Sequence, residues 1–88
     1  MIEGFKKAIQ NFILPRFPWV SDYKVEVGWE EDGMKHINVV YYLEVDDTGV
    51  FTVDANFGRL EETTESVFGM MNDGSISLNN VFFRQAKK

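Results

Sequence analysis

His36 is the only histidine of the chain and the side chain best suited to proton transfer near neutral pH. Apolar and polar residues alternate on both sides of it, which is typical of strands in a sheet with one buried and one open face. We expect the open face to gather a polar group in which Tyr42 lies directly opposite Asp54. Its members are Glu26, His36, Asn38, Tyr42 and Asp54. Such a group could perform acid–base chemistry in a small-ligand-binding protein or an enzyme.

A polar outer face is also an ordinary property of antiparallel sheets, so this open-face site is the alternative and not the leading interpretation. The chain has no cysteine, and no serine stands in a nucleophile motif. We therefore assign no catalytic residue and expect a protein that is not an enzyme.

Two acidic segments, 46–49 and 72–74, look superficially like calcium loops. Neither has the alternating oxygen ligands or the distal glutamate of a twelve-residue calcium loop, and both read better as turns. A single histidine without cysteine argues against a zinc site, and no glycine-rich phosphate-binding motif is present. We expect neither a metal nor a cofactor.

The net charge of −5 is unevenly distributed, because the acidic residues concentrate between residues 22 and 73 while the flanking segments are basic. An expected turn and the expected start of a helix should bring six carboxylates to one end of the domain. These are Glu30, Glu31, Asp32, Glu61, Glu62 and Glu65. Such a patch suits a basic protein partner and disfavours direct binding of nucleic acid.

Length and composition indicate one domain spanning residues 1–88. Of the 88 residues, 44% are hydrophobic, which is enough for one core but not for two. The chain shows no targeting segment and no apolar stretch of bilayer length, and its lack of cysteine suits a reducing compartment. We expect a soluble cytoplasmic protein.

Apolar spacing predicts an α+β fold of order α-β-β-β-α-β, with two helices packed on one face of an antiparallel meander of three to four strands. Pro15 and Pro18 interrupt regular structure between the first helix and the first strand. The predicted helices span residues 2–14 and 59–72, and the predicted strands span residues 22–30, 34–46, 50–57 and 75–84.

Matching the apolar faces predicts Val25 opposite Val39 and Val27 opposite Ile37, joined by a three-residue loop that ends at Gly33. A two-residue turn would place Trp29 opposite His36, which breaks the match. Trp29 and Phe12 are expected on core-facing positions. The predicted core comprises Phe5, Ile9, Val27, Ile37, Val39, Leu43, Val53, Val67 and Phe68.

The last strand is expected to run parallel to the first and third strands, beside the first strand or outside the sheet. Its apolar residues then face both ways, which leaves one side without cover inside the chain. We expect Phe82 and Phe83 to contact a partner, and the protein to form a symmetric homodimer through this strand. In the alternative, a bulge at Asn79 and Asn80 turns these side chains inward and the protein is a monomer.

The element order resembles that of double-stranded-RNA-binding domains and of small acidic secretion chaperones. The former carry basic residues at the start of the second helix, where this chain has Arg59 followed by Glu61 and Glu62. The leading prediction is therefore a non-enzymatic protein–protein interaction module. An adaptor, a chaperone or an inhibitor, including one encoded by a phage, fits this description.

Overall fold

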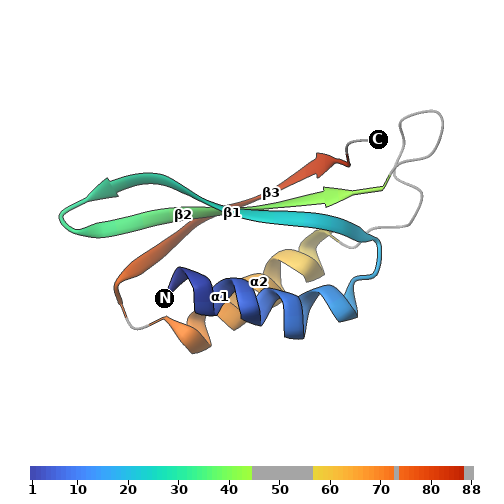
Figure 1. The fold of residues 1–88 in the computed structure, drawn as a ribbon, viewed down its shortest axis with the longest axis horizontal. Coiled ribbons are helices and arrows are strands. Elements are labelled where there is room, and N and C mark those ends of the chain that lie inside the picture. Colours follow the sequence, from blue (N-terminus) through green and yellow to red (C-terminus); the bar gives the residue numbers. More distant parts are fainter. Residues whose placement is uncertain (45–56, 73, 87–88) are drawn as a thin grey trace.

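A three-stranded sheet covered on one face by helices forms the two layers of the domain (Figure 1). The computed structural model describes residues 1–44, 57–72 and 74–86. Element order is α-β-β-α-β, and the sheet is mixed, with strand order β1-β2-β3. The α+β class is confirmed, but the antiparallel meander is wrong, and no fourth strand occurs in the described part of the chain.

The N-terminal helix changes its hydrogen-bonding pattern along its length. It comprises α1 (Ile2–Ala8), the π-helical η1 (Ile9–Ile13) and the 3-10 turn η2 (Leu14–Arg16). In a π-helix the wider turn advances each residue by a smaller angle than in an α-helix. Phe12 is therefore rotated away from the core-facing position expected for it and is 64% exposed.

β1 (Val20–Glu31) and β2 (Met34–Leu43) form an antiparallel hairpin. The predicted pairs Val25–Val39 and Val27–Ile37 are confirmed. The predicted three-residue loop is wrong, because Asp32 and Gly33 form a two-residue turn with φ of 54° and 78°. Positive φ at both central residues is what a tight hairpin turn of this kind requires.

A β-bulge at Gly28 reconciles the short turn with the central register. The register shifts by one residue between Val27 and Trp29, so Gly28 is the extra residue on β1. Since side chains alternate along a strand, the bulge moves Trp29 from the core-facing side to the open face.

After β2 the chain returns to the sheet by way of α2 (Phe57–Met71), close to the predicted helix 59–72. The predicted strand 50–57 lies outside the described residues except for Phe57, the first residue of α2. Helix α2 starts near the end of β2 and runs back across the sheet (Figure 1). β3 (Ile76–Gln85) therefore runs parallel to β2, and not beside the first strand as predicted.

The core lies between the sheet and the helices, and seven of the nine predicted core residues are buried there. Val27, on the edge strand β1, is 47% exposed and is a correction to that prediction. Val53 lies outside the described residues. The confirmed members are Phe5, Ile9, Ile37, Val39, Leu43, Val67 and Phe68.

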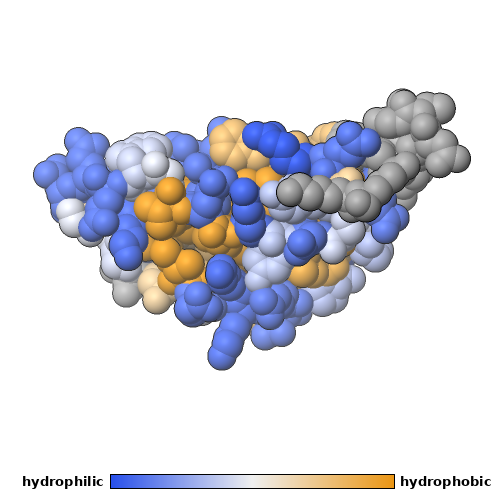
Figure 2. Space-filling model, turned by 45° about the horizontal axis from the view of Figure 1, so that its top comes forward, coloured by the Kyte–Doolittle hydropathy of each residue, from blue (hydrophilic) through white to orange (hydrophobic). Residues whose placement is uncertain are grey.

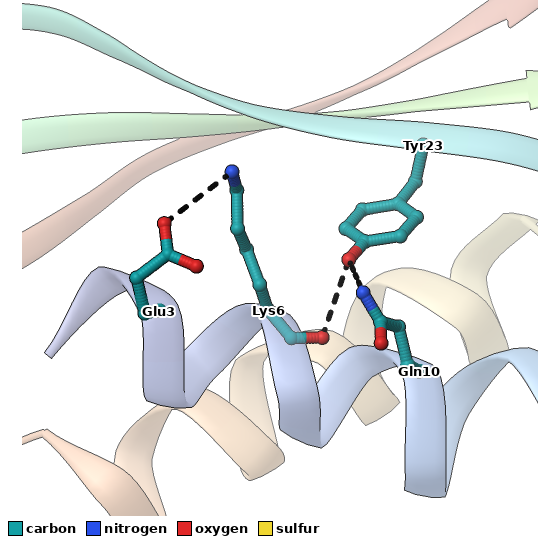
Figure 3. Close-up of polar contacts among 4 residues, drawn as sticks. All are labelled: Glu3, Lys6, Gln10 and Tyr23. Atoms are coloured by element: carbon teal, nitrogen blue, oxygen red, sulfur yellow. Dashed lines mark hydrogen bonds and ion pairs between the residues drawn. The ribbon is translucent and has the colours of Figure 1, made fainter.

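Tyr23 ties β1 to the N-terminal helix (Figure 3). Its hydroxyl accepts a hydrogen bond from Gln10 Nε2 at 2.6 Å and donates to the Lys6 carbonyl at 3.3 Å. On the same helix, Lys6 Nζ lies 3.7 Å from a Glu3 carboxylate oxygen. None of the helices in the described part of the chain is both long and apolar enough to cross a membrane.

Candidate functional site

The open face of the sheet places His36 in contact with an aromatic ring. The Trp29 and His36 rings are stacked, with centroids 4.4 Å apart and an interplanar angle of 14°. This contact exists because the Gly28 bulge pairs Trp29 with His36. The match of apolar faces in the sequence did not predict this pair. The imidazole of the expected acid–base group is therefore covered on one side by Trp29.

Of the five predicted open-face residues, Glu26, His36 and Asn38 are neighbours. Glu26 is paired with Asn38 across the hairpin, and Asn38 Oδ1 accepts a hydrogen bond from Asn79 Nδ2 at 3.0 Å. Tyr42 lies six residues from His36 on the same strand, a separation of about 20 Å.

Tyr42 has Asp22 and Arg84 as its neighbours in the sheet, and not the predicted neighbour Asp54. Asp54 itself lies outside the described residues. A shallow hollow of about 440 Å³ opens on this face, and His36 is not among its lining residues. The hollow is lined by Lys24, Glu26, Val40, Tyr42, Arg84 and Gln85.

A strongly perturbed ionisation is found in the core, at Tyr41. Desolvation by burial raises the pKa of Tyr41 to about 12, and the hydrogen bond with Thr64 lowers the pKa by a smaller amount. The Tyr41 hydroxyl lies 2.7 Å from Thr64 Oγ1, between the sheet and α2. The described residues contain no group of three or more acidic or histidine side chains placed to hold a metal ion.

The six predicted carboxylates do not share one end of the domain. Glu30, Glu31 and Asp32 lie at the tip of the hairpin, where β1 turns into β2. Helix α2 begins at the other end of the sheet, because the Phe57 ring packs against Trp19 and Phe83 with centroids 6.3 and 4.8 Å away. Glu61, Glu62 and Glu65 on α2 therefore form a separate group.

Two of these carboxylates border a groove between α2 and β3. Its volume is about 430 Å³. Glu61, Glu65, Phe68 and Asn72 line one wall, and their spacing of three to four residues identifies a single face of α2. Consecutive residues from Ile76 to Val81 line the other wall. Since β2 occupies one side of β3, this wall is the other, outer edge of that strand.

Phe82 and Phe83, both predicted to contact a partner, lie on opposite faces of the sheet. The register of β3 shifts at Asn79, so the bulge expected in the alternative is present and turns Val81 and Phe83 toward the core, but it does not turn Phe82 inward as that alternative expected. The Phe83 ring is stacked 6.4 Å from that of Tyr41. Phe82 remains on the open face, with the Arg84 guanidinium 5.0 Å from its ring centroid.

A second groove, which we call the helix groove, lies between the N-terminal helix and α2. It has a volume of about 310 Å³ and is lined by Ala8, Phe12, Arg16, Val67, Met70 and Met71. It could not be found from the sequence, because Phe12 occupies a core position in an uninterrupted α-helix. Apolar side chains also gather in a patch framed by polar ones on the face shown in Figure 2.

Comparisons of the chain with protein-family models, with curated proteins and with solved structures find no match.

Proposed function

We propose that this domain is a non-enzymatic protein–protein interaction module that binds a basic, extended segment of a partner protein in the groove between α2 and β3. The observation that carries the proposal is the pair of carboxylates, Glu61 and Glu65, facing the outer edge of β3. None of the described residues that line the groove is a lysine or an arginine. A cationic segment would therefore meet charges of opposite sign on one wall.

The dimensions of the groove suit a short extended peptide. From Glu61 to Asn72 the helix rises about 16 Å, and from Ile76 to Val81 the strand advances about the same distance. That length corresponds to about five or six residues of extended chain. Phe68, Leu78 and Val81 provide apolar surface in the groove. A partner segment in which basic and apolar side chains alternate therefore suits the groove.

The edge of β3 favours recognition by side chains over a continuous strand-to-strand ladder. Asn79 is the bulged residue, and bulges interrupt the pairing of an edge strand. The Asn80 side chain also accepts a hydrogen bond from the Val81 backbone N–H at 2.9 Å. Specificity is then set by the Glu61 and Glu65 carboxylates and by the apolar surface.

The proposal is tested with a fluorescently labelled peptide of about six residues that alternates lysine with valine, followed by anisotropy at low and high salt. Glu61→Gln combined with Glu65→Gln should weaken binding about tenfold, because both charge-assisted contacts are lost. Added salt should weaken binding to the native protein by screening.

The matched control is Glu30→Gln combined with Glu31→Gln, which removes the same charge at the hairpin tip. This pair should change the affinity less than about twofold. An equal loss in both double variants would show a general effect of net charge and would contradict the groove as the binding site. The proposal would also be contradicted if a peptide that alternates glutamate with valine bound with the same affinity as the peptide that alternates lysine with valine.

A further inference from the structure

We infer that the helix groove binds an amphipathic helix of a partner protein, and that acidic side chains of this partner helix contact Arg16. The helix groove and the groove between α2 and β3 are lined by different sides of α2. The inference therefore concerns a second surface and a second partner, and it does not depend on the peptide groove.

The helix groove has a nearly buried floor and two raised walls. Ala8 and Val67 form the floor and are 4% and 7% exposed, whereas Phe12 and Met70 are 64% and 79% exposed. The small side chain of Ala8 leaves room for an apolar side chain of a partner. Since Ala8, Phe12 and Arg16 are spaced four residues apart, the groove follows the N-terminal helix for about 12 Å, or two turns.

This shape suits a helix better than a small molecule or an extended strand. A small-molecule site encloses most of its ligand, whereas Phe12 and Met70 leave this groove open along its length. A strand would lie against two helices and find no sheet edge for backbone pairing. A third helix can insert apolar side chains spaced three to four residues apart, and the flexible methionines can adapt to them.

The charge that borders the helix groove is positive. Arg16 is the charged side chain among the described residues that line it, and none of those residues is a carboxylate. Arg16 is exposed and forms no ion pair within the described part of the chain. A glutamate or aspartate of a partner would therefore gain a charge-assisted hydrogen bond there without breaking an existing ion pair.

The two helices that form the groove run in opposite directions (Figure 1). The Phe5 ring lies 5.3 Å from that of Phe68, and Trp19, which follows the N-terminal helix, lies 6.3 Å from Phe57, the first residue of α2. The end of the N-terminal helix therefore lies beside the start of α2. Arg16 belongs to this end of the groove.

Arg59 adds positive charge at the same end. It precedes Met70 by about three helical turns, which places both residues on the same side of α2. The carboxylates Glu61 and Glu65 line the groove between α2 and β3, and Glu62 lines neither groove. The helix groove is therefore apolar along its length and basic at one end, which is complementary to an amphipathic helix with an acidic end.

The inference is tested with a fluorescently labelled peptide of about 15 residues, a length that permits helix formation. Leucines spaced three and four residues apart form its apolar face, glutamates occupy one end, and alanine and glutamine fill the other positions. A second peptide has glutamine in place of each glutamate. In anisotropy titrations the native protein should bind the glutamate peptide about tenfold more tightly than the glutamine peptide.

Arg16→Gln should weaken binding of the glutamate peptide about tenfold and leave binding of the glutamine peptide unchanged. The matched control Lys7→Gln removes the same charge from the N-terminal helix, at a position that does not line the groove, and should change both affinities less than about twofold. Phe12→Ser combined with Met70→Ser should abolish binding of both peptides. Circular dichroism should show this variant folded, because both residues are exposed. Trp29→Ser, at an exposed aromatic position on the hairpin, should bind as the native protein does.

Equal losses for the two peptides in Arg16→Gln, or unchanged binding to the variant with serine at positions 12 and 70, would overturn the inference. So would a native protein that sediments at twice the 10.2 kDa mass of one chain and returns to that mass in the same variant, because a second copy would then cover the groove. Displacement of the glutamate peptide by an equimolar amount of dodecanoate would assign the groove to a fatty-acid anion and would also overturn it. The peptide that alternates lysine with valine should bind all these variants equally, so the failure of one proposal is distinguishable from the failure of the other.

Discussion

Tyr41 shows how one polar group is accommodated in the core of a small domain. Its hydroxyl donates to Thr64 Oγ1 at 2.7 Å, and the Thr64 hydroxyl donates in turn to the Leu60 carbonyl at 2.7 Å. Both side chains are fully buried, and every buried side-chain polar atom of the described residues has a partner. The pair therefore joins the central strand β2 to α2 without an unsatisfied group.

We predict that stability falls between pH 10 and pH 12 through Tyr41. Its pKa is raised from 10.0 to about 12 in the folded protein, so in this range the unfolded chain ionises while the folded chain keeps its proton. The unfolded state then binds fewer protons, and the free energy of unfolding decreases as the pH rises, by about 3 kcal/mol in all.

Urea unfolding across this pH range, compared between the native protein and Tyr41→Phe, measures the effect. Tyr41→Phe should cost about 1 kcal/mol at neutral pH through the lost hydrogen bond. It should show a smaller loss between pH 10 and pH 12. Parallel pH profiles for the two proteins would contradict the assignment to Tyr41.

At the scale of elements, the Gly28 bulge decides which side chains reach each face near the hairpin tip. A Cβ at Gly28 would lie 3.1 Å from Asn38 Nδ2 and 3.3 Å from the His36 carbonyl oxygen. The amide could turn away, but the carbonyl belongs to the paired strand β2. Position 28 is therefore suited to glycine because the backbone of β2 approaches closely there.

We predict that Gly28→Ala destabilises the domain by about 1 kcal/mol and disturbs the Trp29–His36 stack. Chemical denaturation and the NMR shifts of the His36 ring protons, which sense the indole ring, would measure the two effects. Gly69→Ala is the control, because Gly69 lies in α2 with open space at its Cβ. The control should be stabilising by up to about 1 kcal/mol. A stabilised Gly28→Ala would contradict this account of the bulge.

Local sequence patterns predict some features of these elements and not others. The central hairpin register was predictable, because Val25, Val27, Ile37 and Val39 lie on the same, core-facing side of the hairpin. The turn between the two strands was not predictable. A three-residue loop and a two-residue turn combined with a bulge place the same apolar residues opposite each other. The groove between α2 and β3 depends on where α2 crosses the sheet. That placement is set by long-range packing, such as the contact of Phe57 with Phe83, and has no local signal in the sequence.

At the scale of the whole molecule, the core is centred under β2, which has a neighbouring strand on each side. We predict that Leu43→Ala, at a buried position on β2, costs about 2 to 5 kcal/mol of unfolding free energy. Val27→Ala, on the edge strand β1, should cost less than about 1 kcal/mol because its side chain is half exposed. Equal losses in urea denaturation would show that the core is not centred on β2.

The parallel pairing of β2 with β3 has a consequence for the order of folding. β1 and β2 meet across a two-residue turn, whereas Asn38 and Asn79, which are hydrogen-bonded across the other pair, are 41 residues apart in the chain. Closing so long a loop costs more entropy, so we expect the hairpin to form early and β3 to dock late. During synthesis, one edge of β2 stays open until β3 has emerged. The Val39-Val40-Tyr41 segment on that edge is then accessible to chaperones and to wrong strand pairing.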